Sequence, residues 1–421
     1  MTTDTLASRA TTTDFLNKVP AITATFWLIK ILSTTIGETF ADYLAVNVGL
    51  GTAVTDGAMF AVLAVTLFAQ LRTRRYTPWL YWLTVVLVSI VGTQITDFFT
   101  DQLGVSLYAS TAVFAVVLAV VFTIWWLEER TLAITAIDSP RRERFYWAAV
   151  LVTFALGTAG GDLATEALSL GFRVGVLIFG GLILATWGAK KLGMNAVLAF
   201  WIAYVLTRPL GASLGDLLTQ SRAYGGLGLG ASVTSLLFLT VIVVLVAREQ
   251  VVVSRHGIRD KGDAPAVSPR RDYAWAAGGA VAIIGAAALL TAPPATPSAS
   301  AAPLTVAAPG TAATPGSAAP VPDTTSPLGD LTSFAVIVDD VAASVKKGDL
   351  AAGRTRIKDL EVAWDDAEAA IKPASPNDWH TMDSAIDDAL TALRATPPSQ
   401  GDSAAAMSQL QQVIATLDQK K

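Results

Sequence analysis

Four aspartates recur in one sequence frame, each at the end of a long apolar stretch. The segments 27–42, 82–97, 147–162 and 201–216 all begin with tryptophan, end with aspartate and carry glycine five residues before that aspartate. The aspartates are Asp42, Asp97, Asp162 and Asp216, the glycines are Gly37, Gly92, Gly157 and Gly211, and the tryptophans are Trp27, Trp82, Trp147 and Trp201. Because a charged side chain is costly inside a bilayer, a repeated acid of this kind predicts a functional site.

Carboxylate chemistry suggests what such a site would bind. Glu38 precedes Asp42 by four residues, so the two share a helix face. Thr93 and Thr158 follow their glycines directly and offer hydroxyl oxygens. Oxygen ligands suit Mg²⁺, Mn²⁺ or Ca²⁺. The chain has no cysteine, and its two histidines, His256 and His380, lie outside the expected spans, so a copper or zinc pathway is not expected. The sequence therefore predicts a manganese-like or magnesium-like site formed by Asp42, Asp97, Asp162, Asp216 and Glu38.

The same residues allow other interpretations. The aspartates equally mark the points at which the spans leave the hydrocarbon, and clustered carboxylates can also carry protons. The tryptophans are typical of an interfacial belt that holds the spans in register. Glu166 lies four residues after Asp162, but among its counterparts in the other repeats only Asp101 is acidic, so we favour Asp162 over Glu166 as a site residue.

Two cations accompany the acids within these spans. Lys30 lies eight residues before Glu38, and Arg208 lies eight before Asp216. Each either pairs with a carboxylate or extends towards the membrane interface. Pro209 and Gly211 follow Arg208 and weaken the helix there. An interrupted helix beside a charged group indicates a transport site.

These residues require a membrane scaffold. The 421 residues are 52% hydrophobic, with a mean hydropathy of +0.51. A second apolar segment follows each frame, at 57–71, 106–127, 172–189 and 230–247. We therefore predict an all-α polytopic protein whose core, 19–250, holds four parallel two-helix hairpin repeats of about 19–76, 77–130, 143–191 and 195–250, giving eight spans.

Basic residues set the expected orientation. They gather in the loops after the even-numbered spans, which places the polar N-terminal tail, 1–18, and the basic loop 251–272 in the cytoplasm. A ninth span, 273–292, then leads outward into a Pro/Ala/Ser/Thr-rich linker, 293–326. This order predicts an integral membrane protein with an extracytoplasmic domain at 327–421.

The repeat architecture resembles a known family. With "GETFAD" ending the first frame and "GTAGGD" ending the third, residues 18–250 look like a bacterial membrane-protein family catalogued as a repeat of unknown function. The resemblance implies four tandem repeats, each with two transmembrane segments and a characteristic tryptophan. It also implies a location in the bacterial inner membrane, with the domain at 327–421 in the periplasm. It implies no activity.

The C-terminal region, 327–421, contains 15 acidic and 9 basic residues. Apolar residues with a helical period predict a small helical bundle. Its acids and histidine, Glu361, Asp365, His380 and Asp383, form either a solvated charged face or an accessory cation site. No catalytic motif is present, so neither an enzyme nor a cofactor is expected.

The leading hypothesis is a secondary transporter or exporter of divalent metal cations. A proton-coupled carrier or channel for a small organic solute is the second, and a membrane anchor that displays the acidic bundle is the third. The expected partners are the lipid bilayer and the transported cation or solute, with no nucleic acid.

Overall fold

The computed structural model describes residues 17–42, 44, 52–167, 171–220, 226–256, 326–365, 367–372 and 374–420. The side chains of Glu38, Asp42, Asp101, Glu166 and His256 lie outside the described part, as do the tail 1–16, the expected ninth span and nearly all of the linker. The chain divides into two compact units, each of which is described by itself.

Eight long helices make up the first unit, two for each expected repeat. Their bounds are α1 (Ala24–Asp42), α2 (Thr52–Arg72), α3 (Pro78–Asp97), α4 (Leu107–Glu129), α5 (Pro140–Asp162), α6 (Gly171–Lys191), α7 (Ala196–Thr219) and α8 (Ala231–His256). A 3₁₀ turn, η3 (Ile134–Ala136), precedes α5, and the π-helical turns η2 (Phe98–Gln102) and η4 (Leu163–Ala167) extend α3 and α5. The predicted all-α fold with four two-helix repeats is confirmed.

Local sequence signals fix several helix ends. Pro78 and Pro140 stand in the first turns of α3 and α5, where the missing N–H of proline costs nothing. The Ser139 side chain accepts a hydrogen bond from the backbone N–H of Arg142 and so caps α5. At the end of α4, Arg130 adopts a left-handed conformation with φ of 54°, which stops the helix.

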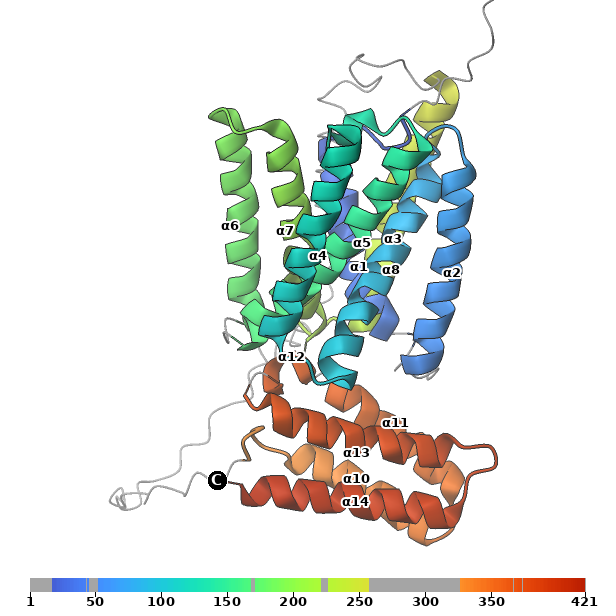
Figure 1. The fold of residues 1–421 in the computed structure, drawn as a ribbon. Coiled ribbons are helices and arrows are strands. Elements are labelled where there is room, and N and C mark those ends of the chain that lie inside the picture. Colours follow the sequence, from blue (N-terminus) through green and yellow to red (C-terminus); the bar gives the residue numbers. More distant parts are fainter. Residues whose placement is uncertain are drawn as a thin grey trace, which may run out of the picture. The chain divides into compact units, whose positions relative to one another are not determined.

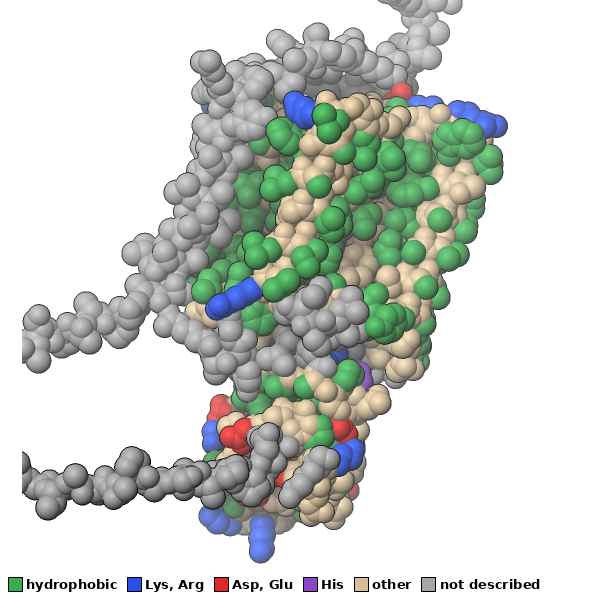
Figure 2. Space-filling view, turned by 90° about the vertical axis from the view of Figure 1, so that its left-hand side faces the viewer, with side chains coloured by type: hydrophobic (Ala, Val, Ile, Leu, Met, Phe, Trp, Pro, Cys, Tyr) green, Lys and Arg blue, Asp and Glu red, His purple; other side chains and the backbone are tan. Residues whose placement is uncertain are grey.

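Seven of these helices are long and apolar enough to cross a membrane, and the first expected span contributes a shorter apolar helix, Ala24–Gly37. The chain is therefore a membrane protein. Large apolar side chains such as Val65, Leu177 and Leu236 are exposed on the surface of the unit. In Figure 2, hydrophobic side chains cover much of the described surface of this unit, and several of its lysine and arginine side chains lie along one edge. Such a surface suits contact with lipid.

The first helix of each repeat lies inside the unit. Helices α1, α3, α5 and α7 pack in that order, and α7 packs back on α1, so the four close into a ring. Figure 1 shows these helices from the side, running alongside one another. We call these four the inner helices and α2, α4, α6 and α8 the outer helices. In the most apolar 18-residue stretch of each span, 67%, 50% and 61% of the residues of α3, α5 and α7 are buried. The corresponding values for α2, α4, α6 and α8 are 22%, 11%, 22% and 28%.

The outer helices pack on the following repeat. Helix α2 packs on α3, α4 on α5, α6 on α7, and α8 on α1. The two helices of one repeat make few contacts with each other. The two helices of one repeat are therefore not each other's main packing partners, because each outer helix buries its face against the next inner helix. The packing of α8 on α1 completes the cycle.

The C-terminal region contains amphipathic helices. The C-terminal helices are α10 (Thr332–Lys346), α11 (Leu350–Asp365), α12 (Glu368–Ile371), α13 (Pro376–Arg394) and α14 (Gln400–Gln419). Apolar residues at helical spacing are buried on α10, α13 and α14, including Val338, Met382 and Leu410. Helices α10 and α14 pack together. The helical periodicity of the sequence thus corresponds to helices with one buried face.

Candidate functional site

The repeated glycines set the spacing of the inner ring. A Cβ added to Gly37 would lie 2.1 Å from Ser89 Oγ, and one added to Gly92 would lie 2.6 Å from Phe154 Cβ. The remaining two interfaces are equally close. A Cβ added to Gly157 would lie 2.5 Å from Arg208 Cβ, and one added to Gly211 would lie 1.9 Å from Thr34 Oγ1. A side chain at any of the four positions would force neighbouring inner helices apart.

The four glycine contacts share one register. Each glycine faces the residue that stands three positions before the glycine of the next repeat, namely Ser89, Phe154, Arg208 and, through ring closure, Thr34. The ring is therefore a fourfold pseudosymmetric arrangement of the sequence frame. These four residues occupy equivalent positions on the four helices, and Arg208 is the charged residue among them.

Arg208 joins all four inner helices. Its side chain leaves α7 and is fully buried. Its Nε donates to Thr158 Oγ1 on α5 at 2.9 Å, and Nη2 donates to Thr93 Oγ1 on α3 at 2.6 Å. Its Nη1 donates to the carbonyl oxygen of Thr34 on α1 at 3.2 Å. The guanidinium therefore lies at the axis of the ring.

The hydroxyls that receive these bonds are themselves held in place. Thr93 donates to the carbonyl of Ser89, and Thr158 donates to the carbonyl of Phe154, each on its own helix. Each hydroxyl can therefore present a lone pair to Arg208. Glu38 occupies the same frame position on α1, and its side chain lies outside the described part.

Lys30 is the second buried cation of the inner ring. It is 1% exposed, and its ammonium lies 3.7 Å from the ring centroid of Phe154 and 4.4 Å from that of Tyr204. Aromatic faces attract cations, most strongly where water is excluded. The structure thus directs Lys30 and Arg208 into the bundle, so neither extends to its surface.

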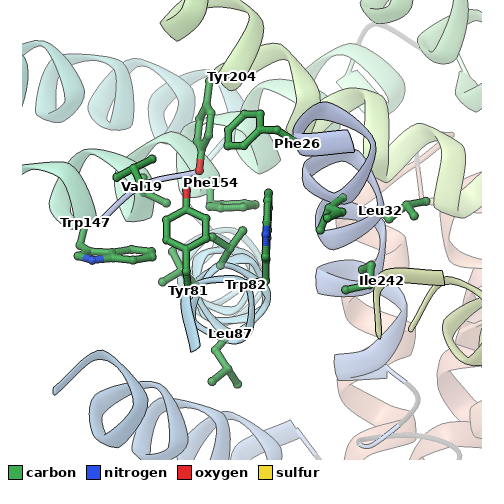
Figure 3. Packing of buried hydrophobic residues seen from close by; sticks show 14 of the residues in the cluster. Val19, Phe26, Leu32, Tyr81, Trp82, Leu87, Trp147, Phe154, Tyr204 and Ile242 are labelled. Carbon is green, nitrogen blue, oxygen red and sulfur yellow. The ribbon is translucent and has the colours of Figure 1, made fainter. Parts of the chain in front are cut away.

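An aromatic cluster fills the tryptophan-bearing ends of the inner helices (Figure 3). The hydroxyls of Tyr81 and Tyr146 lie 2.5 Å apart, and Tyr204 points its hydroxyl towards Tyr81 beside Phe154. An aromatic residue precedes the frame tryptophan in every repeat: Phe26, Tyr81, Tyr146 and Phe200. The cluster closes this end of the ring with packed rings and a few hydroxyls.

The frame tryptophans belong to the same cluster. Trp82, Trp147 and Trp201 are buried, and Trp27 is half-buried. The indole N–H of Trp82 donates to Glu249 of α8 at 3.0 Å, and that of Trp201 donates to the carbonyl of Leu132 at 3.0 Å. The structure places these side chains within the helix packing, whereas an interfacial belt would have them face outward.

The described aspartates stand at the opposite ends of the inner helices. Asp97 and Asp162 are the last residues of α3 and α5, and Asp216 lies near the end of α7; all three are half-buried. Their spans end at Thr100, Thr165 and Thr219, three residues beyond each aspartate. Asp216 follows Arg208 by eight residues, or about 12 Å along the helix. The aspartates and the Arg208 guanidinium therefore lie at different depths along the inner helices.

The described residues include no group of three or more histidine, aspartate or glutamate side chains that could hold a metal ion. Asp97, Asp162 and Asp216 are not gathered into such a group, and Asp42 has no described side chain. Glu361, Asp365, His380 and Asp383 are likewise not gathered into a metal site. The supporting residues Thr93, Thr158 and Arg208 do come together.

A second buried polar cluster had no counterpart among the sequence predictions. Glu143, at the start of α5, forms an ion pair with Lys18, and both are nearly fully buried. Gln70 of α2 donates to the other carboxylate oxygen of Glu143 at 3.2 Å, and Lys18 also donates to the carbonyl of Leu71. The frame contains none of these residues, so no repeat signal marked them. The aromatic residue before each tryptophan lies just outside the four aligned segments, but it recurs in every repeat and could have been found by extending them by one residue.

Comparison with known proteins is consistent with this architecture. The family model described as Repeat of Unknown Function (DUF347) matches residues 25–76, 80–131, 145–191 and 199–251. No curated protein and no solved structure matches the chain. The four matched segments coincide with the four pairs of inner and outer helices. The chain therefore belongs to the DUF347 family and carries four copies of its repeat.

Proposed function

We propose that the protein is a membrane carrier that moves a small anionic solute, such as a carboxylate, through the axis of the inner ring. The observation that supports this proposal is Arg208, fully buried in a span and directed at residues of the three other inner helices. An ionisable residue at such a place is costly to keep and is a functional-site candidate for that reason.

Charge favours an anion. Lys30 and Arg208 both bring cationic groups into the ring, and Arg208 has a further interaction besides the hydrogen bonds given above. A positive interior attracts anions and opposes the passage of cations. The planar guanidinium, in addition, offers paired N–H groups that match the two oxygens of a carboxylate.

The threonines make exchange feasible. Thr93 and Thr158 give Arg208 neutral acceptors. A carboxylate that replaced them would form charge-assisted hydrogen bonds, which are roughly twice as strong as neutral ones. The released hydroxyls could then donate to the same anion. The site would remain hydrogen-bonded with and without its substrate.

Helix α7 offers a place for movement. Pro209 lies inside α7 beside Arg208 and cannot donate the hydrogen bond that the helix would otherwise make there. A helix interrupted at a charged residue is a recurring feature of transport sites. Bending at Pro209 would shift Arg208 relative to the aromatic cluster. We further propose the orientation that the basic loops predict, with the N-terminus in the cytoplasm.

A divalent metal cation remains the second candidate substrate. Its support is the common depth of Asp97, Asp162 and Asp216, each three residues before the end of its span. These acids would attract a cation, or accept a proton, at the aspartate-bearing end of the ring. A cation bound there would act as a coupling ion if the axis carries an anion.

Ligand-induced stabilisation of the purified protein in detergent distinguishes the two substrates. The probes are acetate, succinate, sulfate and phosphate as sodium salts, and MnCl₂ and MgCl₂ at matched ionic strength. We expect at least one anion to raise the melting temperature and to show labelled uptake into protein-containing liposomes. Stabilisation by the divalent cations alone would contradict the anion proposal and favour the second candidate.

Variants then test the residue that carries the proposal. Arg208→Lys keeps the charge and loses the paired N–H groups, so anion affinity should fall about tenfold or more. Arg173→Lys, at an exposed arginine of α6, is the matched control and should bind as wild type. Lys30→Met provides a second variant if Arg208→Lys does not fold. Unchanged anion binding in both site variants would exclude the axis as the binding site.

A further inference from the structure

A small pocket opens between α2 and the junction of α3 with η2, away from the axis of the ring. Its volume is about 210 Å³. Its lining combines one acid, one amide and mainly apolar or aromatic side chains: Asp56, Phe60, Gln94, Ile95, Phe98 and Phe99. All six belong to the described part of the chain. A pocket of this size accommodates only a small ligand.

Gln94 is the residue that indicates a ligand in this pocket. Its side chain is 8% exposed, yet neither its amide nitrogen nor its amide oxygen has a hydrogen-bond partner. Buried polar atoms are normally satisfied, and an exception needs an explanation. The preceding residue, Thr93, faces Arg208 at the axis. Gln94 instead contributes its amide to the pocket.

Asp56 and three phenylalanines define the chemistry of the pocket. Asp56 is half-buried near the start of α2 and makes no hydrogen bond or ion pair with any described residue. Phe60, Phe98 and Phe99 are partly exposed beside it, and the rings of Phe98 and Phe99 meet edge to face at 5.9 Å. The lining therefore offers a negative charge, aromatic faces and an amide that can either donate or accept.

We propose that this pocket binds a small organic ammonium ion. The cationic nitrogen would lie at the Asp56 carboxylate and against the phenyl faces, which attract cations. The Gln94 oxygen would accept an N–H from a primary amine, and the organic substituent would contact Phe60, Phe98 and Phe99. This site goes beyond the proposed carrier function, because none of its residues contacts Arg208 or Lys30 through any hydrogen bond or ring contact described above.

Other occupants fit less well. A divalent metal ion needs at least six oxygen ligands or several tightly held waters, and the lining supplies oxygens from Asp56 and Gln94 alone. An inorganic anion would be repelled by Asp56. A lipid chain would leave the carboxylate and the amide without partners. An ammonium ion with an apolar substituent satisfies all three features of the lining.

The test uses the full chain in lipid nanodiscs and two ligands of the same shape. Labelled benzylammonium is the charged probe, and benzyl alcohol is its neutral counterpart. We expect saturable binding of benzylammonium and a much weaker interaction with benzyl alcohol. Asp56→Asn should lower benzylammonium affinity at least tenfold, and Gln94→Leu should lower it by a smaller factor.

Matched controls lie on the same unit. Phe68→Leu alters an exposed phenylalanine two turns further along α2, and Glu128→Gln alters an exposed acid at the end of α4; both should bind benzylammonium as wild type does. Equal affinity for the charged and neutral probes would overturn the proposal, because it would show a merely apolar crevice. Wild-type affinity in folded Asp56→Asn, or no saturable binding to the wild type, would overturn it as well.

Discussion

The inner and outer helices have similar lengths, and all of them except α1 are long and apolar enough to span a membrane, yet their side chains have different roles. The inner helices carry the buried cations Lys30 and Arg208, the threonines that bond to Arg208 and the glycines at the close contacts. The outer helices expose large apolar side chains such as Val65 and Leu236. The apolar stretches of the outer helices have mean hydropathies of 1.7, 2.4, 1.7 and 2.3, against 1.6, 1.4 and 1.4 for α3, α5 and α7, because a few polar side chains per inner helix lower the mean.

Pseudosymmetry explains how the difference arises. One sequence frame, repeated four times, builds the ring from the first helix of each repeat. The frame keeps glycine at each contact while the residue facing it varies from Thr34 to Ser89, Phe154 and Arg208. The scaffold is thus repeated, and the chemistry is confined to one place in it. Substitutions should therefore have much larger effects on inner helices than on outer ones.

The largest expected difference concerns buried and exposed ion pairs. Glu143→Gln on α5 leaves the buried Lys18 without its carboxylate and should lower the free energy of unfolding by about 3–5 kcal/mol. Arg141→Gln, at an exposed position of the same helix, breaks a pair with Glu128, with both side chains more than 40% accessible, and a longer contact of 3.5 Å with Glu129, and should cost about 0–1 kcal/mol. Unfolding in mixed detergent micelles measures both. Equal losses would mean that the Lys18–Glu143 pair is not buried.

Glycine substitutions should give opposite signs in the two sets. Gly157→Ala places a Cβ 2.5 Å from Arg208 Cβ, so the helices must separate at a cost of about 1–3 kcal/mol. Gly188→Ala on α6 meets nothing within 4 Å and should stabilise the protein by up to about 1 kcal/mol, because alanine favours helix. Melting temperatures of the two variants give the comparison. A neutral Gly157→Ala would remove the evidence for close packing at this contact.

Tryptophan substitutions should follow the same division. Trp82→Phe removes the indole N–H that bonds to Glu249 and should cost about 1.5–3 kcal/mol. Trp187→Phe on α6 changes an exposed ring and should stay within about 0.5 kcal/mol of wild type. If the two variants unfold alike, the frame tryptophans are interfacial side chains rather than packing residues.

Hydroxyl substitutions should show the smallest difference. Thr96 donates to the carbonyl of Ala155 on the neighbouring inner helix at 3.1 Å, so Thr96→Val should cost about 0.5–1.5 kcal/mol. Thr240, exposed on α8, bonds only within its own helix, and Thr240→Val should be nearly neutral. The same unfolding assay resolves both variants. A larger loss for Thr240→Val would reverse the assignment of inner and outer faces.

Much of this architecture could be predicted from sequence. The Trp/Gly/Asp frame indicated four repeats of two helices, and the glycine positions coincide with the contacts of the ring. Repetition is informative here because a residue that appears four times in one register is under a common structural demand. The aromatic cluster was not predicted, although an aromatic residue precedes each frame tryptophan.

The partners of these residues could not be predicted. Hydropathy does not encode the direction of a side chain around a helix, so Arg208 and Lys30 were equally compatible with the axis and with the membrane interface. The packing of each outer helix on the next repeat depends on the closure of the whole ring. Lys18 and Gln70, which bond to Glu143, lie far apart in sequence and outside the frame, so no local pattern linked them.

Ring closure is the central claim, since the axis site exists only if the fourth repeat returns to the first. The absence of native cysteine makes it directly testable by oxidative cross-linking. Thr39 on α1 and Ser235 on α8 have hydroxyl oxygens 2.6 Å apart, so a Thr39→Cys/Ser235→Cys double variant should form an intramolecular disulfide. The control pair Thr39→Cys/Thr240→Cys, with the second cysteine at an exposed site on α8, should not. Rapid cross-linking of the first pair alone is the predicted result, and no intramolecular cross-link in that pair would contradict the closed ring.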